Sequence, residues 1–486
     1  MKFQNKKIKC FIFSIAIAAT GVFTGVANAQ NEKIGAKLAV TKLPTRGDFV
    51  IRGAYVMTMD DQLGDIKRGD VHFSNGKIIA VGEGLNAGSA KIIPGKGMVL
   101  MPGLIDSHTH LWTTQMRGNF GDTPEKIYFR TRNTLGDGFQ ARDMYYGTRM
   151  GAAEAVYSGI TMVMDFNHNA RGEEFVRESL KGIAETGLRA RFLYGATTIM
   201  KPTESIDLAL MQKMATSWSA FVGDAPITLG LAWRGPLGIM TPLPGEMPSP
   251  SLSIAREEID TARRLGLPIS THVSGNQAQR QFQSLIDGKF LGKDLQLIHM
   301  SNLPPEQIKI AADAGSSIAL TPITELRVGY GLTNLSDFIN SGAKVGIGID
   351  SNSLAGTSDI FSVMKLFQML EAGRTKNELA ITPRKLLRLA TIEGAQSLNM
   401  GDQIGSITPG KNADMIMINM NAINIGMFAE DPAHLIVEAV RPENIDTVVI
   451  DGRILKRNGR LTAINVTRIV NETTQSITEI VNRTKK

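Results

Sequence analysis

The chain has 486 residues, of which 43% are hydrophobic and 20% charged, and its formal net charge is +7. This composition excludes a disordered chain, a collagen and a disulfide-rich miniprotein. A single cysteine excludes an internal disulfide and a zinc site built from several thiolates.

The first thirty residues have the pattern of a secretory signal peptide. Four lysines within residues 1–9 precede an apolar run over residues 10–26, and Ala27-Asn28-Ala29 follows as a cleavage sequence. The alternative is a membrane anchor, which is disfavoured because the run has only about 17 residues and is interrupted by glycines. We therefore predict cleavage after Ala29, a periplasmic or secreted location, and no stable membrane span once the segment is removed.

The positive charge of the chain has a local origin. Loss of the leader lowers the net charge of +7 by four and removes the only cysteine. No dense basic patch remains apart from the last four residues, RTKK. Because nucleic-acid binding needs a concentrated basic surface, we expect no nucleic-acid partner.

Short β-patterns occupy both ends of the chain that follows the leader. Residues 49–81 contain two apolar runs joined by Asn75-Gly76, a pair typical of a hairpin turn. Similar runs return at residues 413–419 and 447–461, the second with Asn458-Gly459. These patterns predict a small β-sandwich domain built from both termini.

Eight short apolar runs alternate with helical patterns in the middle of the chain. They begin at residues 103, 159, 189, 227, 267, 295, 316 and 344. Alternating strands and helices predict a parallel sheet, and eight units match a closed (β/α)8 barrel of the TIM type. The alternative is a doubly wound open sheet, but no glycine-rich phosphate loop follows the first strand.

These patterns divide the chain into five parts. We predict a signal peptide at 1–29, the first part of the β-sandwich at 30–100, the barrel at 101–400, the second part of the β-sandwich at 401–464, and a C-terminal tail with helical spacing at 465–486.

Four of the seven histidines lie in three of the predicted strands. His108 and His110 are two residues apart, so they face the same side of a strand. His272 and His299 lie near the ends of the fifth and sixth strands, and Asp350 ends the eighth. Because barrel enzymes place their chemistry at the carboxyl ends of the strands, these five residues are candidates for one site. The other three histidines are expected to be structural: His72, His168 and His434. For His168, which directly follows the second strand, a place at the mouth of the site is the alternative.

The run MPGLIDSHTH at residues 101–110, the later strand histidines and the aspartate of the eighth strand resemble the amidohydrolase superfamily. The nearer likeness is to its branch of cytosine deaminase, adenosine-type deaminases and triazine chlorohydrolases, whose H-x-W-x-x-x-x-R-G run is similar to HLWTTQMRG at residues 110–118. The resemblance covers nearly the whole chain after the leader. It implies hydrolysis of a C–N bond in a small molecule, namely an amide, urea, carbamate or amino-heterocycle, and it admits a homo-oligomer.

The resemblance also implies a role for each site residue. In this family pattern His108, His110, His272 and Asp350 hold one divalent metal, and His299 orients the water or the substrate oxygen. Asp350 accepts a proton from the attacking water and passes it to the leaving group. Relatives with two metals carry a lysine on the third or fourth strand, where this chain has none. We expect a single zinc ion, although iron, manganese or cobalt would also suit these ligands.

One position departs from the family pattern. The branch carries a glutamate three residues after the fifth-strand histidine, and this chain has Gly275 there. Either the substrate needs no ring protonation, or Glu325 after the seventh strand replaces the acid, or the protein is a non-enzymatic member that binds a metal or ligand. Glu325 has an equally weighted alternative as an exposed carboxylate at a helix start.

Three further side chains are candidates for substrate binding. Trp112 and Gln115 follow the paired histidines and are expected to line the pocket. Arg234, which follows the fourth strand, has the charge to pair with an anionic substrate group, and a surface charge is its alternative.

Overall fold

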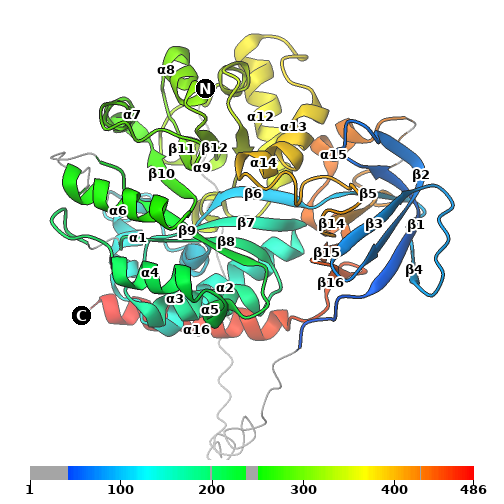
Figure 1. Cartoon of the computed structure of the whole chain (residues 1–486), viewed down its shortest axis with the longest axis horizontal. Helices are drawn as coiled ribbons and strands as arrows, with labels where there is room; N and C mark the ends of the chain where they lie inside the picture. Colours follow the sequence, from blue (N-terminus) through cyan, green and yellow to red (C-terminus); the bar gives the residue numbers. More distant parts are fainter. Residues whose placement is uncertain (1–41, 198–199, 237–249, 427, 429, 486) are drawn as a thin grey trace, which may run out of the picture. The chain divides into compact units, whose positions relative to one another are not determined.

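The computed structural model describes residues 42–485, except 198–199, 237–249, 427 and 429 (Figure 1). The predicted signal peptide and its cleavage site lie outside the described residues. Among the helices of the described ranges, none combines the length and the apolar character needed to cross a bilayer.

Eight parallel strands form the central sheet, and each pairs with the strands before and after it along the chain. Each of the eight predicted runs contains one of these strands, so the predicted barrel is confirmed. The strands are β6 (Leu104–Thr109), β7 (Ile160–Asn167), β8 (Arg189–Gly195), β9 (Ile227–Trp233), β10 (Ile269–Val273), β11 (Leu295–His299), β12 (Ser317–Leu320) and β13 (Val345–Ile347).

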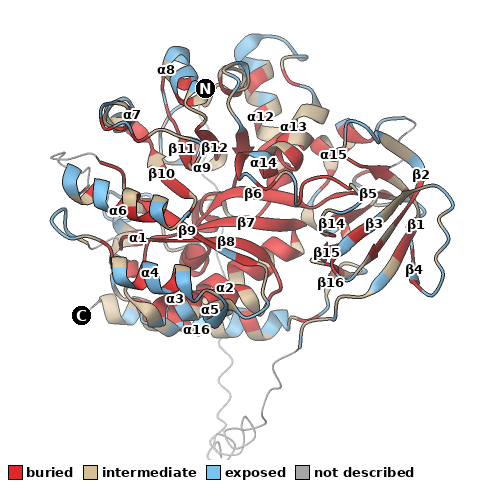
Figure 2. Cartoon of the chain, in the orientation of Figure 1, coloured by how far each residue is buried: buried red, intermediate tan, exposed pale blue. Residues whose placement is uncertain are grey.

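Helices follow the strands and cover the outside of the barrel (Figure 1). Figure 2 shows the central strands β6, β7 and β8 buried along nearly their whole length, whereas many helices have one buried and one exposed side. A strand covered on both faces is apolar throughout instead of alternating, which explains the continuous apolar runs in the sequence. The helical elements are η1 (Leu111–Met116), α1 (Tyr128–Asp137), α2 (Ala141–Tyr157), α3 (Glu173–Ala184), α4 (Leu208–Thr216), α5 (Ser219–Val222), α6 (Leu252–Arg264), η2 (Gly275–Gln277), α7 (Ala278–Asp287), α8 (Pro305–Asp313), α9 (Pro322–Arg327), α10 (Leu335–Asn340), α11 (Asn352–Ala355), α12 (Ile360–Thr375), α13 (Pro383–Leu389) and α14 (Ile392–Ser397).

The last strand of the barrel returns to the first. The backbone N–H of Asp350 donates to the carbonyl of His108 at 2.8 Å, and the N–H of His110 donates to the carbonyl of Asp350 at 2.6 Å. This approach needs Gly348, because a Cβ there would lie 2.8 Å from the carbonyl oxygen of His108. The glycine therefore lets the closing segment bring Asp350 against the paired histidines.

Strands from both ends of the chain form one nine-stranded mixed sheet, in the order β17-β16-β15-β14-β5-β1-β2-β3 with β4 beside β1. The predicted small β-domain drawn from both ends is thus confirmed. The strands are β1 (Asp48–Met57), β2 (Asp65–Ser74), β3 (Lys77–Gly82), β4 (Lys91–Pro94), β5 (Met98–Pro102), β14 (Met415–Asn419), β15 (Ile445–Ile450), β16 (Arg453–Arg457) and β17 (Arg460–Leu461).

Both predicted hairpin turns are present in this sheet. Asn75 and Gly76 join β2 to β3 with φ angles of 48° and 88°, and Asn458 and Gly459 join β16 to β17 with 50° and 73°. Two consecutive residues with positive φ match the twist of an antiparallel pair, which is why Asn-Gly is favoured there. The exact boundaries of the five predicted parts stay a prediction.

The C-terminal tail forms α16 (Val466–Thr484) and packs on α2 of the barrel. Asp143 of α2 accepts a hydrogen bond from Ser476 at 2.8 Å and pairs with Arg483 at 2.5 Å. The remaining elements, α15 (Ala433–Ala439) and η3 (Pro442–Asn444), connect β14 to β15.

Candidate metal centre and active site

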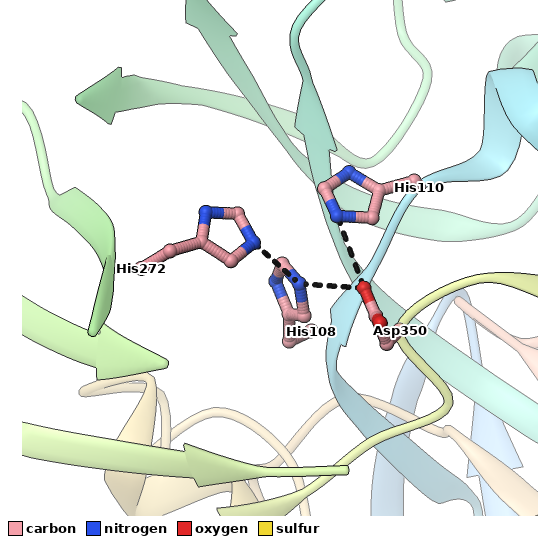
Figure 3. A group of neighbouring side chains, drawn as sticks. All are labelled: His108, His110, His272 and Asp350. Carbon is pink, nitrogen blue, oxygen red and sulfur yellow. Dashed lines mark hydrogen bonds and ion pairs between the residues drawn. The ribbon is translucent and has the colours of Figure 1, made fainter. Parts of the chain in front are cut away.

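Four predicted metal ligands point toward one another from separate parts of the barrel (Figure 3). His108 lies on β6 and His110 directly follows it, His272 lies on β10, and Asp350 follows β13. Alternation along β6 places both of its histidines on the inner face, as the two-residue spacing predicted. His108, His110 and Asp350 are buried and His272 is half-buried, and their ligand atoms all lie within 4.8 Å of one another.

The separations within this group fit a tetrahedral metal site. Nε2 of His108 lies 3.1 Å from Oδ1 of Asp350 and 3.3 Å from Nε2 of His272, and Nε2 of His110 lies 3.0 Å from Oδ1 of Asp350. Ligands about 2.1 Å from a zinc ion in a tetrahedron would be separated by about 3.4 Å. The donor set therefore has the size that a small divalent cation requires.

The hydrogen bonding of His110 also argues for a cation at this point. Its Nδ1 lies 2.7 Å from the carbonyl oxygen of Phe166, which can only accept, so Nδ1 carries the proton. In the neutral ring, Nε2 then turns a lone pair toward the carboxylate of Asp350. Two acceptors face each other unless a cation lies between them, so these residues fit a bound metal.

Burial acts on two of the histidines, and neighbouring side chains act on the aspartate. Desolvation lowers the pKa of His108 to about 3 and the pKa of His272 well below its usual value. Burial opposes ionisation of Asp350, yet His108 and His110 beside it hold its pKa well below the usual range. Neutral imidazoles beside an ionised carboxylate are the protonation states that metal ligands need.

Two site residues have backbone conformations that side chains seldom adopt. His299 has a φ of 71° and Asp350 a φ of 64°. The left-handed region is uncommon for residues other than glycine, although asparagine, aspartate and histidine adopt it more readily than other side chains. His299 is the last residue of β11 and Asp350 follows β13, so both lie at the carboxyl ends of barrel strands.

His299 is held by a carboxylate from the next strand's loop. Its Nδ1 lies 3.1 Å from Oε1 of Glu325 and 3.0 Å from the hydroxyl of Thr321. Glu325 is only 1% exposed and also accepts hydrogen bonds from the N–H of Thr321 at 2.8 Å and from the hydroxyl of Thr333. The alternative of an exposed helix-start carboxylate is therefore wrong, and Glu325 is placed to orient His299.

Gly275, which stands where the family pattern has a glutamate, lies against the aromatic ring of Tyr330. Gly275 has a φ of 64°, and a Cβ on it would lie 3.0 Å from Cε1 of Tyr330. The ring of Tyr330 also packs edge-on to the ring of His299, with centroids 5.6 Å apart. A longer side chain at position 275 would meet this ring and would require a strained backbone.

Trp112 and Gln115 both lie on η1, directly after the paired histidines, and are buried. The amide nitrogen of Gln115 donates to the carbonyl of Asp143 at 2.8 Å, so this side chain is anchored to α2. Trp112 packs edge-on against Phe139, with ring centroids 5.2 Å apart. Their roles in substrate binding stay predictions.

Arg234 has its charge balanced within the protein. Its guanidinium lies 3.0 Å from the carboxylate of Glu258, with side chains 2% and 1% exposed, and it donates to the carbonyls of Lys201 and Glu204. The structure thus excludes the surface-charge alternative. The existing partners also leave Arg234 poorly suited to an anionic substrate.

One buried histidine near the site was assigned a structural role by its sequence context. His168 follows β7, and its ring lies 4.4 Å from the ring of His110. Neither of its ring nitrogens has a hydrogen-bond partner among the described residues. Its place one residue after a strand was the available signal, since strand ends in a barrel face the active site.

Comparison with known proteins gives a family and two kinds of relative. The model of the amidohydrolase family matches residues 99–455. A 5′-deoxyadenosine deaminase of Methanosarcina acetivorans is 27% identical over 452 residues, which cover 90% of this chain and 99% of the relative. A 5-methylthioadenosine/S-adenosylhomocysteine deaminase of Desulforamulus reducens is 26% identical over 449 residues, covering 87% and 97%.

Solved structures share the fold. An adenosine deaminase from Xanthomonas campestris with bound zinc superposes with a TM-score of 0.77 at 22% identity and covers 90% of this chain and 100% of its own. The atrazine chlorohydrolase TrzN from Arthrobacter aurescens, also complexed with zinc, gives a TM-score of 0.76 at 23% identity over 88% and 100%.

The relatives correct the prediction of a periplasmic or secreted location. They are archaeal and bacterial deaminases, and this chain matches 99% of the length of the Methanosarcina acetivorans and Methanosarcina mazei enzymes. Neither is named as a periplasmic or secreted protein, so the location inferred from the leader pattern is withdrawn.

The family match spans the whole barrel and the strands of the β-domain from β5 to β16. It agrees with the barrel that the structure shows. The chain belongs to the amidohydrolase family, as a hydrolase acting on carbon–nitrogen bonds other than peptide bonds.

Proposed function

We propose that this protein uses a single divalent metal, zinc in the first instance, to hydrolyse a C–N bond of a small molecule. The observation that carries the proposal is the convergence of His108, His110, His272 and Asp350 with ligand separations of 3.0–3.3 Å. Zinc is favoured because it accepts histidine and carboxylate ligands in a tetrahedron, and because two of the structural neighbours hold it. A single ion is favoured because β8 and β9 contain no lysine.

Each residue of the site has its own role in the proposed reaction. His108, His110, His272 and Asp350 would hold a divalent cation, which would supply an activated water as the nucleophile at neutral pH. Asp350 accepts the proton from the attacking water and returns it to the leaving nitrogen. His299, fixed through Nδ1 by Glu325 and Thr321, presents its other ring nitrogen to the substrate oxygen or to the water.

The departure at Gly275 favours one group of substrates. The named relatives act on adenosine derivatives, whereas this chain has no carboxylate at that position, and Glu325 is engaged with His299, Thr321 and Thr333. An amide, urea or carbamate needs no ring protonation before attack. We therefore favour these compounds over amino-heterocycles.

The test is a substrate panel on protein of known metal content. Zinc-loaded protein is incubated with amides, ureas, carbamates, 5′-deoxyadenosine and aminated triazines, and release of ammonia or amine is measured. We expect about one metal per chain, as a four-ligand site implies, and turnover in the first three classes. His108→Ala should lose both metal and turnover, and full activity in this variant would overturn the proposal.

A second candidate function rests on Gly275 alone. A protein that retains its metal but turns over nothing in the panel would instead be a non-enzymatic binding member. Turnover of 5′-deoxyadenosine alone would keep the metal-dependent hydrolysis and overturn the preference for amides, ureas and carbamates.

A further inference from the structure

His168 is a buried imidazole whose hydrogen-bonding capacity is unused. Its residue is 2% exposed, and both Nδ1 and Nε2 lack a partner among the described residues. Leaving a buried polar group without a hydrogen-bond partner destabilises the folded protein. Native proteins accept that cost where a ligand supplies the missing hydrogen bonds, so the position of this ring needs an explanation.

The rings around His168 belong to the candidate active site. Its centroid lies 4.4 Å from that of His110, 5.2 Å from that of Trp112 and 5.9 Å from that of Phe166. The indole nitrogen of Trp112 is likewise buried and has no partner in the described part of the chain. Two unsatisfied polar rings therefore lie side by side next to a predicted metal ligand.

These two rings offer both kinds of hydrogen-bonding group. A neutral imidazole offers one donor and one acceptor, and the indole of Trp112 offers one donor. A neutral amide, with its C=O and N–H in one plane, complements such a set, whereas a carboxylate has no donor to offer it.

We propose that His168 is a substrate-binding residue that, with Trp112, recognises a neutral amide, ureido or lactam group of the substrate beside the metal centre. The inference rests on the proposed function, because it takes the reacting bond to lie at the metal, and it adds the chemical class of the adjoining group. It also gives a residue expected to be structural a role in specificity.

The test compares three variants with the wild-type protein. His168→Phe keeps a ring and removes both nitrogens, His168→Asn restores a donor and an acceptor, and His72→Phe is the matched control. His72 already has a partner, since its Nε2 lies 2.7 Å from Oδ1 of Asp48 in the β-domain. Each protein is measured for zinc content, thermal stability, thermal shift with the panel compounds, and KM and kcat for the compounds that are turned over.

The proposal expects a particular combination of results. His168→Phe should keep its zinc and melt no lower than the wild type, because it removes unsatisfied buried groups. Its KM for amides or ureas should rise about tenfold with little change in kcat, as the loss of one hydrogen bond implies. His168→Asn should recover part of that affinity, and His72→Phe should leave KM unchanged.

Other results overturn the inference. A lower melting temperature of His168→Phe with unchanged KM would show that the ring is a satisfied structural residue, and loss of zinc would make it part of the metal site. Binding of amides that depends on His168 without turnover would reject the proposed hydrolysis and keep the inference. Turnover with the same KM in His168→Phe as in the wild type would keep the proposed hydrolysis and reject the role of His168. If no compound of the panel binds or reacts, the proposed hydrolysis and the role of His168 are both rejected.

Discussion

Oε1 of Glu325 lies 3.1 Å from Nδ1 of His299, and the same oxygen accepts a hydrogen bond from the backbone N–H of Thr321. The carboxylate therefore fixes both the direction of the imidazole and the turn that follows β12. Glu325 was singled out from the sequence as a replacement proton donor, and that role stays a prediction. Its contacts place it to position another side chain.

Glu325→Gln tests this positioning role. The amide keeps the size of the side chain but carries no charge, so its hydrogen bond to Nδ1 of His299 is weaker and the ring is held less firmly. We expect kcat to fall about 10–100-fold, the range found when partners of metal-site residues are removed, while zinc content stays the same.

The control for this variant is Glu371→Gln. Glu371 is also buried and bonded to Ser336 and Arg374, but it lies on α12 away from the site residues. It should lower stability without changing kcat per folded protein. Equal kcat values for Glu325→Gln and the wild type would show that Glu325 does not orient His299.

Metal binding should be visible without any substrate. A ligand that binds only the folded state stabilises it by RT ln(1 + [L]/Kd), or about 2.7 kcal/mol at a hundredfold excess over Kd. Chelator-treated protein should therefore melt at a higher temperature when zinc is added, measured by differential scanning calorimetry. Asp350→Asn should abolish this shift, whereas His434→Ala, at an exposed residue of α15, should keep it. A full zinc shift in Asp350→Asn would remove Asp350 from the ligand set.

Gly275→Glu should not convert the protein into an adenosine-type deaminase. The substitution places a side chain on a backbone with φ of 64° and against the ring of Tyr330. The backbone conformation alone costs about 1–2 kcal/mol, so we expect a lower free energy of unfolding in urea and no gain of activity on 5′-deoxyadenosine. Adding Tyr330→Ala removes the contact and should restore part of the stability. A stable, active Gly275→Glu deaminase would contradict this account of the loop.

Arg234→Met should act on stability and leave substrate affinity unchanged. Removing the guanidinium leaves Glu258 buried without its partner, and breaking a buried ion pair from one side costs about 3–5 kcal/mol. Urea unfolding should show this loss, and Arg234→Met/Glu258→Met should recover most of it. A large rise in KM without loss of stability would instead show that Arg234 binds the substrate.

Much of this protein follows from its sequence. Eight apolar runs separated by helical patterns determined the strands of the barrel, since a parallel strand covered on both faces must be apolar throughout. The spacing of His108 and His110 determined that both face inward, and the positions of His272 and Asp350 at strand ends placed them at the same mouth. These features depend on local periodicity and on the direction of the chain, which the sequence contains.

The partner of each buried polar group was decided only by the tertiary structure. Glu325 meets His299 across 26 positions, Arg234 meets Glu258 across 24, and the rings of Trp112 and His168 come from loops after different strands. Sequence spacing gives the face on which a side chain lies, but packing between elements decides whether a carboxylate is exposed, pairs with a guanidinium or holds a histidine. The energy of a buried polar group depends on that partner, and so does its role.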